Sequence, residues 1–277
     1  MTTLLNKIGL GTVQFGAHYG ISNSTGKTPL QEVGEIVRYS ESIGIKYLDT
    51  AFAYGDAEDV LGKFDLDSFR IISKYIPSEI TLPKQFEISL DRLGIEAFYG
   101  YMAHRPYDLI ENRQNWEFLM KLKTKGKVKK IGASFNSVEE LEEIFQKGLE
   151  LDIVQVPLNY FDHRFDAYIK ALHEKGVEIH TRSTFLQGLF FCAPDSLDMF
   201  FDEVKPYLET LQQLDNLSVR LLRYVLEKDY VDVVNIGVND LNQFKENILT
   251  LGKMHNKLPL LNHKFEDKIL MPSEWPK

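Results

Sequence analysis

Cysteine is almost absent from this sequence. Its 277 residues contain one cysteine, Cys192, so an internal disulfide and a zinc or iron–sulfur site built from several cysteine thiolates are both excluded. This composition is typical of proteins from a reducing compartment. The first residues, MTTLLNKIGLGTVQFG, also lack an apolar core of the length found in signal peptides. We therefore expect a cytoplasmic protein.

Long apolar runs and basic patches are missing as well. No stretch approaches the roughly 18 consecutive apolar residues that cross a bilayer. The net charge of −8 comes without the basic stripe that binds phosphate backbones. The seven histidines include no His-x-His pair and no H-E-x-x-H motif, which argues against a metal-dependent hydrolase. We therefore expect no membrane, nucleic-acid or metal partner.

A regular alternation of short and long segments runs through the chain. Eight short runs rich in β-branched and aromatic residues are each followed by a longer amphipathic stretch, which predicts parallel strands joined by helices. The expected strands are Ile8–Val13, Lys46–Thr50, Phe69–Ser73, Ala97–Ala103, Lys129–Ala133, Asp152–Val156, Val177–Thr181 and Val231–Ile236. The expected helices cover residues 29–43, 56–63, 83–93, 111–125, 138–147, 162–175, 203–228 and 240–251. Eight units without a linker predict an α/β fold, a (β/α)8 TIM barrel that forms a single domain over residues 1–277.

Local signals mark several helix ends. Thr28, followed by Pro29 and Gln31, predicts an N-cap, a first-turn proline and a capping-box partner. Ser137 with Glu140 repeats the capping-box pattern after the fifth strand. Glycines close to four helix ends predict left-handed stops; they are Gly44, Gly126, Gly148 and Gly176.

Two segments have loop-like composition and fall outside the alternation. Residues 188–202 are expected as a long loop after the seventh strand, and residues 255–277 as a C-terminal extension. The active site of such a barrel lies at the C-terminal ends of its strands, where the loops gather. Both segments are therefore candidates to cover the mouth of a site.

Two glycine motifs fail as phosphate-binding loops. Gly9-x-Gly11 has Gln14 where a dinucleotide-binding loop needs its third glycine. In the run GISNSTGKT, five residues rather than four separate Gly20 from Gly26, so it misses the P-loop spacing. An ordinary polar loop is the better interpretation of this run.

Four polar residues stand at the ends of strands two, three and four. Asp49 and Tyr54 fall in YLDTAFAYG, Lys74 in IISKY and His104 in YMAHRP. The ends of barrel strands converge on one mouth, so these side chains can meet although the sequence separates them widely. Each has an ordinary alternative on its own: a helix cap, a packed tyrosine, a solvated lysine or a structural histidine. Their joint position at three successive strand ends favours a catalytic site.

The chemistry of this set suits the reduction of a carbonyl. Hydride addition puts negative charge on the carbonyl oxygen, which then needs a proton, and a tyrosine with an ordinary pKa of about 10 is a weak acid unless a cation favours its phenolate. Lys74 would supply that cation, with Asp49 as its counter-ion. His104 would hydrogen-bond the carbonyl oxygen and stabilise its developing charge. Tyr54 is then the proton donor.

At these residues the sequence resembles the aldo-keto reductase superfamily, from about Ile8 to Asn247. LDTAFAYG is similar to the family's LDTA-x-x-YG block, and SK and the His of AHRP fall where the family has its Lys and His. Gly237 followed by Gln243 and then Glu246-Asn247 resembles the family's cofactor block in the last strand–helix unit. The resemblance implies a proton relay of Asp49, Tyr54, Lys74 and His104, with direct hydride transfer from a nicotinamide to a small carbonyl substrate, an aldehyde or ketone that could be sugar-like.

The resemblance also implies a set of cofactor-binding residues. They are Thr12, Ser134, Gln155, Arg182, Ser183, Gly237, Asn239, Gln243, Glu246 and Asn247. Two positions depart from the family. Phe135 stands where the family has an asparagine after the serine, although Asn136 is a candidate to replace that asparagine. Arg182 stands where relatives present an aromatic ring to stack on the nicotinamide. These departures indicate a divergent member.

Cofactor preference and substrate contacts are read from the same resemblance. Relatives that prefer NADP have an Arg or Lys just past the glycine of the last block, where this chain has Asn239 and Asp240. NADP(H) keeps the greater weight, because Lys245 or the helix N-terminus can still contribute, and NAD(H) is the alternative. Residues just past strand ends are the expected substrate contacts; we expect Gln14, Tyr19, Phe52 and Arg105. The alternative to an enzyme is a cofactor-binding redox sensor or regulatory subunit of the same fold with little turnover.

Overall fold

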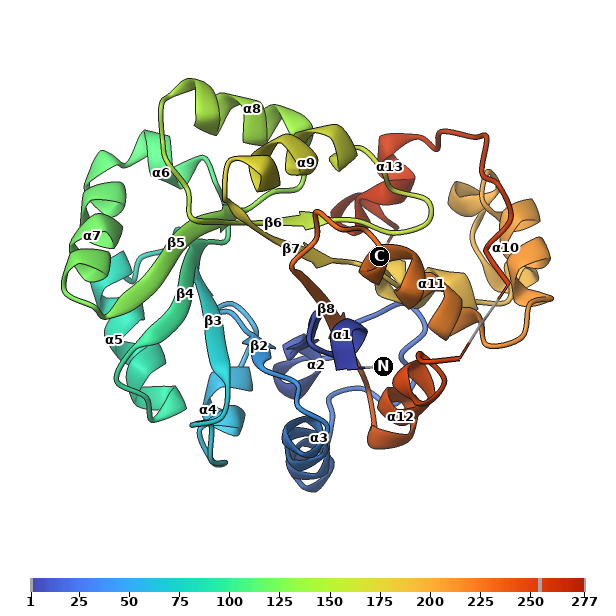
Figure 1. The fold of residues 1–277 in the computed structure, drawn as a ribbon, viewed down its shortest axis with the longest axis horizontal. Helices are drawn as coiled ribbons and strands as arrows, with labels where there is room; N and C mark the ends of the chain where they lie inside the picture. Colours follow the sequence, from blue (N-terminus) through green and yellow to red (C-terminus); the bar gives the residue numbers. More distant parts are fainter. Residues whose placement is uncertain (1, 254–255, 277) are drawn as a thin grey trace.

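The structure is a computed structural model, and it describes residues 2–253 and 256–276. Eight parallel strands form a closed barrel in which each strand pairs with the next along the chain and β8 pairs with β1. Helices surround the strands (Figure 1). The strands are β1 Ile8–Gly11, β2 Tyr47–Asp49, β3 Arg70–Tyr75, β4 Phe98–Ala103, β5 Val128–Ser134, β6 Ile153–Pro157, β7 Glu178–Arg182 and β8 Val233–Gly237. The predicted (β/α)8 barrel is confirmed.

The helices pack their apolar faces against the outside of the barrel. In α3, the buried residues Val33, Ile36 and Val37 recur at the spacing of one helix face, and each such side chain contributes roughly 1.5–3 kcal/mol when it leaves water. The helices are α1 Thr2–Leu5, α2 Val13–Gly16, α3 Leu30–Ser42, α4 Ala57–Leu61, α5 Leu82–Leu93, α6 Asp108–Glu111, α7 Arg113–Thr124, α8 Val138–Gln146, α9 Asp166–Glu174, α10 Lys205–Gln212, α11 Leu217–Leu226, α12 Leu241–Leu249 and α13 Asp267–Leu270. Among residues 2–253 and 256–276, no helix combines the length and the apolar content that a membrane crossing requires.

An apolar layer fills the middle of the barrel. It consists of Tyr47, Ile72, Met102, Ile153 and Val233. Side chains alternate along a strand, so the residues two positions further on also face the interior. These are Asp49 on β2, Lys74 on β3 and Gln155 on β6. The sequence periodicity thus places a polar layer directly above the apolar one, at the C-terminal ends of the strands.

Two predicted helix features are wrong. The stretch 203–228 is not one helix but two, α10 and α11, because the chain turns at Asn216, whose backbone is left-handed with φ +53°. Thr28 does not cap α3; the residue before the helix is Pro29, and the Thr28 hydroxyl donates instead to the backbone oxygen of Asn239. The Thr28 hydroxyl, which the local sequence predicted as the cap of α3, is thus used in a tertiary hydrogen bond next to the start of α12.

Other helix ends agree with the sequence. Ser137 and Glu140 form the expected capping box at the start of α8. The four predicted glycine stops all have left-handed backbones, with φ between +71° and +86°; they are Gly44, Gly126, Gly148 and Gly176. A Cβ at any of these four would meet nothing within 4 Å. The backbone angle, and not lack of space, therefore requires glycine there.

The segment after β7 and the C-terminal tail form a second apolar cluster beside the barrel. The first contains the short 3-10 helices Leu186–Phe191, Pro194–Ser196 and Met199–Phe201, and the tail contains α13 and the 3-10 turn Pro272–Glu274. Buried residues from both pack together around α10 and α11, among them Phe190, Leu208, Phe265 and Ile269. Figure 1 shows α10 and α13 on the same side of the barrel. The predicted loop and extension are thus largely packed structure, and within the described residues the tail does not line the cleft at the barrel mouth.

Candidate active site

A chain of buried polar side chains crosses the top of the barrel. The two carboxylate oxygens of Asp49 have different partners: Oδ1 accepts from Lys74 Nζ at 2.7 Å, and Oδ2 accepts from Gln155 Nε2 at 2.7 Å. Ser134 Oγ in turn donates to Gln155 Oε1 at 3.4 Å. All four residues are buried. Because β2 and β6 are not neighbours, the contact between Asp49 and Gln155 spans the barrel interior and joins its two sides.

Lys74 is fully buried and its ammonium is held by oxygen atoms. Besides Asp49, it donates to the backbone oxygen of Thr50 at 2.9 Å. Burial lowers the pKa of Lys74, while the charge of Asp49 and its hydrogen bond oppose this. A buried cation without a counter-ion would be strongly unfavourable, so the ion pair is the condition for keeping a charge at this depth. The predicted pairing of Lys74 with Asp49 is present.

Tyr54 lies beside this ion pair. Lys74 Nζ stands over the Tyr54 ring, 5.3 Å from its centroid, and the ring packs edge-on against His104 with centroids 5.7 Å apart. Burial raises the pKa of the Tyr54 phenol above its ordinary value, the charge of Asp49 raises it further, and Arg182 opposes both. In this arrangement the phenol stays protonated around neutral pH. It therefore has a proton to donate, but the raised pKa makes it a weaker acid than an ordinary tyrosine, and the lowering that the sequence predicted from Lys74 is not seen.

His104 completes the group as a neutral imidazole. Burial, and after it the positive charges of Lys74, Arg182 and Arg105, lower the pKa of His104 to about 3. Its Nδ1 is buried and has no hydrogen-bond partner. A neutral imidazole can direct a ring N–H at a carbonyl oxygen without competing with Tyr54 as the acid.

A cleft opens above this layer. Ten of the predicted site residues line it: Thr12, Gln14, Tyr19, Asp49, Tyr54, Arg182, Ser183, Gly237, Asn239 and Gln243. Eight others do not line it. Four of these lie in or beside the buried polar layer: Lys74, His104, Ser134 and Gln155. The other four lie outside both the layer and the cleft lining: Phe52, Arg105, Glu246 and Asn247.

The predicted substrate residues divide accordingly. Gln14 and Tyr19 line the cleft. Phe52 instead packs its ring under the guanidinium of Arg92, 5.0 Å from Cζ to the ring centroid, and Arg105 is exposed. A position just past a strand end therefore does not by itself predict that a residue lines the cleft; the direction of its side chain decides this.

The segment after β7 bridges the cleft to the loop after β1. Ser183, Leu186 and Gln187 have left-handed backbones, which turn the chain sharply. The backbone oxygen of Gln187 accepts from Ile21 N at 2.9 Å, and its side chain donates to the Tyr19 hydroxyl at 3.0 Å. The residues around Gln187 thus form one wall of the cleft, as predicted for the loop that follows the seventh strand.

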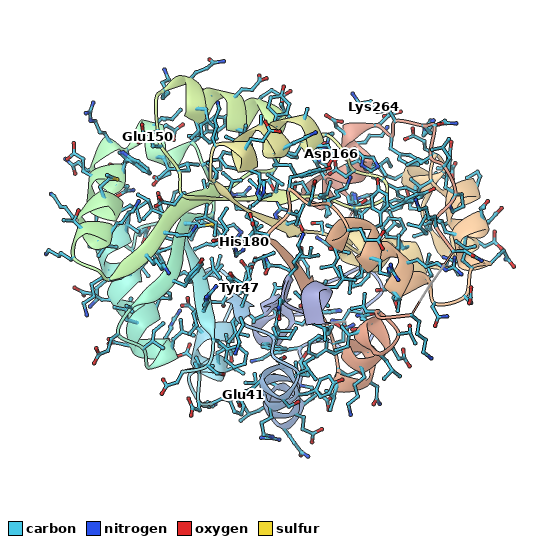
Figure 2. All side chains as sticks on the ribbon, viewed as in Figure 1. Glu41, Tyr47, Glu150, Asp166, His180 and Lys264 are labelled. Carbon is cyan, nitrogen blue, oxygen red and sulfur yellow. The ribbon has the colours of Figure 1, made fainter. Side chains whose placement is uncertain are left out.

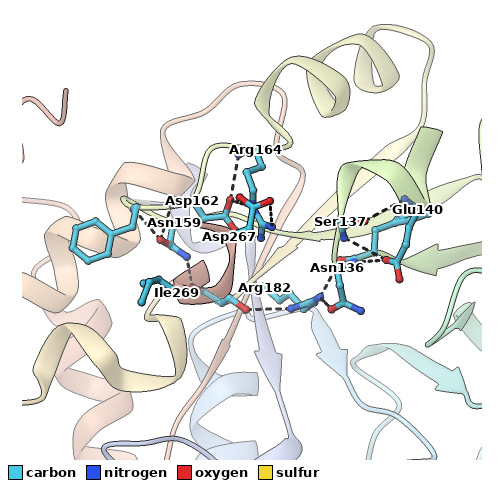
Figure 3. Close-up of polar contacts among 12 residues, drawn as sticks. Asn136, Ser137, Glu140, Asn159, Asp162, Arg164, Arg182, Asp267 and Ile269 are labelled. Atoms are coloured by element: carbon cyan, nitrogen blue, oxygen red, sulfur yellow. Dashed lines mark hydrogen bonds and ion pairs between the residues drawn. The ribbon is translucent and has the colours of Figure 1, made fainter. Parts of the chain in front are cut away.

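Arg182 extends from the end of β7 into this cleft (Figure 3). Its Nη2 donates to the backbone oxygen of Phe135 at 2.9 Å and to Asn136 Oδ1 at 2.6 Å, and its Nη1 donates to Ser183 Oγ at 3.3 Å. All three acceptors are uncharged. Asn136, which the sequence offered as a replacement for the family's asparagine, thus orients Arg182 in this structure.

Sequence reasoning missed two further residues, one that lines the cleft and one whose side chain lies at the start of α12. Asn235 faces the cleft from β8; the side-chain amide is buried, and neither its oxygen nor its nitrogen has a partner. Gly9, its register partner on β1, leaves the necessary space, because a Cβ there would lie 2.2 Å from Asn235 Oδ1. Glu32, from α3, accepts from the backbone N–H of Leu241 at 2.6 Å at the start of α12. Only Asn235 had a sequence signal, a polar residue inside an apolar strand.

Comparison with known proteins gives a consistent result. Residues 7–254 match the model of the Aldo/keto reductase family. The chain is 26% identical over 179 residues to Aldo-keto reductase YhdN of Bacillus subtilis (strain 168), which covers 58% of this chain and 52% of that protein. It is 25% identical over 217 residues to the NADH-specific methylglyoxal reductase of Escherichia coli (strain K12), covering 67% and 65%. The chain thus spans about half the length of the Bacillus relative and about two thirds of the Escherichia one.

Solved structures share the fold. The holo form of aldo-keto reductase AKR11C1 from Bacillus halodurans has a TM-score of 0.70 at 20% identity, covering 91% of this chain and 88% of that chain. The thermostable aldo-keto reductase Tm1743 has a TM-score of 0.65 at 21% identity, covering 97% and 95%. At such identities the likeness concerns the architecture, and the chemistry has to be argued from the side chains of the cleft.

Proposed function

Because the chain belongs to the aldo/keto reductase family, we propose that it reduces an aldehyde or ketone to an alcohol with a nicotinamide cofactor, and that Tyr54 donates the proton. The observation that carries this proposal is the contact of Tyr54, which lines the cleft, with His104 and with the buried Lys74–Asp49 pair beside it. The family supports carbonyl reduction in general. The roles of the individual residues are our proposal.

The cleft fits a nicotinamide nucleotide. Its lining includes polar atoms that the protein leaves without partners, the Asn235 amide and Gln14 Oε1, and buried groups of this kind normally bind a ligand or water. Ser183, Gly237, Asn239 and Gln243 also line the cleft and would hold other parts of the nucleotide. When bound, the cofactor supplies the hydride.

The side chains of this protein would position the carbonyl and protonate it. A carbonyl oxygen held near the Tyr54 hydroxyl is also within reach of a neutral His104, which orients it by hydrogen bonding. As negative charge develops on that oxygen, the Tyr54 proton moves to it, and the nearby positive charges of Lys74 and Arg182 stabilise the phenolate that is left. Asp49 keeps Lys74 charged and fixed in place.

The cleft supports a carbonyl substrate with an apolar part. Tyr19, Phe185 and Phe191 contribute aromatic side chains to its walls, and aromatic walls with a few polar groups are usual in small-molecule sites. A small aldehyde such as methylglyoxal is a suitable probe, since a relative is named for its reduction.

The contacts at the start of α12 favour NAD(H) over NADP(H), the reverse of the weighting that the sequence suggested. The resemblance would put the adenosine 2′-position near Asn239. There, Asp240 accepts from Gln243 N and Glu32 accepts from Leu241 N, so two carboxylates occupy the N–H groups that could bind a phosphate. Lys245 does not compensate, because its amine lies over the Tyr39 ring at 5.4 Å. Two negative charges here would repel a 2′-phosphate.

A single-turnover experiment tests the proposal. The protein is preloaded with NADH or with NADPH, methylglyoxal and other small aldehydes are added, and the absorbance of the reduced nicotinamide is followed. We expect oxidation of the cofactor, and tighter binding of NADH than of NADPH. Tight cofactor binding without oxidation by any aldehyde would instead favour the regulatory subunit.

A further inference from the structure

We propose that Arg182 makes the cleft discriminate between the two redox states of the cofactor, so that the protein binds the reduced, uncharged nicotinamide more tightly than the oxidised, cationic one. This inference rests on the proposed function, since it concerns the nicotinamide cofactor of that site. It adds a property that the four residues at the cleft floor do not imply.

The position of Arg182 places any bound nicotinamide within its field. A hydride donor must touch the carbonyl carbon, and the carbonyl oxygen must lie at the Tyr54 hydroxyl. Tyr54, Asp49 and Arg182 line one cleft, so a ring that reaches the Tyr54 hydroxyl enters a space that Arg182 also borders. The guanidinium is held beside the cleft by its bonds to Phe135 O and Asn136 Oδ1, and its charge contributes to the pKa shifts of Tyr54, Lys74 and His104.

The charge of Arg182 is not cancelled locally. Its three hydrogen bonds go to Phe135 O, Asn136 Oδ1 and Ser183 Oγ, which are all neutral, and within the described residues it forms no ion pair. The nearest carboxylate along this chain of contacts is Glu140, which accepts from the backbone N–H groups of Asn136 and Ser137 in the capping box of α8 (Figure 3).

The other charged groups that face the centre do not neutralise Arg182 either. Asp49 lines the cleft, but both of its oxygens are engaged, one by the ammonium of Lys74. Arg105 adds a further positive charge near His104, which is itself neutral. Glu58 also acts on Lys74, but its carboxylate accepts from Ser73 and Ser89 and lies beside Arg92. The result is an excess of positive charge at this mouth in a protein whose net charge is −8.

The physical consequence follows from the charge of the ring. Reduced and oxidised cofactors share the same adenosine, riboses and pyrophosphate, and they differ by one positive charge on the nicotinamide. Two like unit charges a few ångströms apart in a partly buried cleft repel each other enough to change a binding constant by at least about tenfold. Arg182 therefore weakens binding of the oxidised form and favours its release after turnover.

The bonds of Arg182 explain why it does not swing away from a cationic ring. Nη2 alone is held by two oxygen atoms from the β5–α8 connection, so moving the guanidinium would leave a buried backbone oxygen and an amide without their donor. The Arg182 guanidinium therefore stays close to the ring, because moving away to relieve the repulsion would cost those hydrogen bonds.

The test is the ratio of dissociation constants for oxidised and reduced cofactor, measured by calorimetry or fluorescence in the absence of substrate. We expect the wild-type ratio to favour the reduced form, Arg182→Gln to lower it by about tenfold, and Arg182→Lys, which keeps the charge, to retain most of it. ADP-ribose, which lacks the nicotinamide, should bind wild type and Arg182→Gln alike. Arg113→Gln removes an exposed guanidinium on α7 and should leave the ratio unchanged.

The outcomes separate this inference from the proposed function. If both redox forms bind and the ratio is the same in wild type and Arg182→Gln, the inference is wrong while the proposed function stands. If Arg182→Lys loses the ratio as completely as Arg182→Gln does, shape rather than charge is responsible and the inference is equally overturned. If no nicotinamide nucleotide binds to the wild-type protein, the proposed function fails and the inference fails with it.

Discussion

The two ends of the barrel interior both contain buried charge, but they use it differently. At the N-terminal ends of the strands, Glu178 accepts hydrogen bonds from His180, Tyr99 and Lys130. At the C-terminal ends, the Asp49–Lys74 pair is similarly satisfied, yet Asn235, Gln14 and His104 present polar atoms without partners, and Arg182 has only neutral acceptors.

The difference separates stability from function. Figure 2 shows Tyr47 and His180 near the middle of the ring of strands, where the edge of one ring packs against the face of the other. Polar groups that bond to one another, as around Glu178, hold neighbouring strands together, although His180 Nδ1 there has no partner. Polar groups left open toward a cleft cost stability and are kept where a ligand completes them. The N-terminal end is thus mainly a structural network, and the C-terminal end is the candidate site.

The largest effect should come from Tyr54→Phe. Removing the proposed acid should lower turnover by about 10²- to 10⁴-fold, with cofactor affinity near the wild-type value and little change in the free energy of unfolding. Tyr47→Phe is the matched control at the other end of the barrel, where the hydroxyl accepts a hydrogen bond from Arg70. Steady-state kinetics and cofactor titrations measure both variants, and turnover that survives Tyr54→Phe would show that the acid role is wrong.

Lys74→Met should be the most destabilising of these changes. It leaves Asp49 as a buried carboxylate without its cation, which costs about 3–5 kcal/mol of unfolding free energy. Lys130→Met, at the N-terminal end, removes a partly exposed lysine from Glu178 and should cost about 1 kcal/mol or less. Denaturant unfolding monitored by circular dichroism gives both values, and equal losses would contradict the contrast between the two ends.

Glu178→Gln should change the pH dependence of stability. Burial alone would raise the pKa of Glu178, but its bonds from His180, Lys130 and Tyr99 outweigh burial and lower the pKa to about 2. Because the folded-state pKa lies below the unfolded value, the carboxylate contributes stability above about pH 4.5, and this contribution is lost as the pH falls toward 2. Unfolding at about pH 6 should show a deficit of about 1–3 kcal/mol in the variant, and the deficit should shrink at about pH 3; a constant deficit would oppose this account.

The smallest effect concerns His104. With its pKa lowered to about 3, the imidazole stays neutral throughout the physiological range, so its ionisation should not appear in the pH profile of kcat/KM between about pH 5 and 8. A clear inflection near pH 6.5 that disappears in His104→Gln would mean that the histidine titrates in the working enzyme. The open end of the barrel would then be more solvated than the structure indicates.

Much of the fold was predictable because it depends on local regularities. The eight strands follow from β-branched runs, and the helix stops follow from glycines that only a left-handed backbone requires. The prediction failed where distant contacts compete with local signals. Thr28 bonds to Asn239 instead of capping α3, and the chain between α10 and α11 turns at Asn216 where the sequence reads as one helix.

The polar floor of the cleft was predictable for a similar reason. Asp49, Tyr54 and Lys74 belong to short motifs at strand ends, and barrel geometry alone brings such ends together. The directions of the side chains were not predictable. Phe52 and Arg105 also follow strand ends, yet neither lines the cleft.

The sequence by itself determined the barrel and the family and predicted the residues of the proposed proton relay, because periodicity, glycine stops and compact motifs act over a few neighbouring positions. Only the tertiary structure decided which polar groups are satisfied and which are open. Glu32 accepts from Leu241 N at the start of α12, which lies 209 positions away in the sequence. Arg182 donates to Asn136, which lies 46 positions away. Such contacts depend on how the closed barrel places its loops, and they decide the charge that a ligand in the cleft would meet.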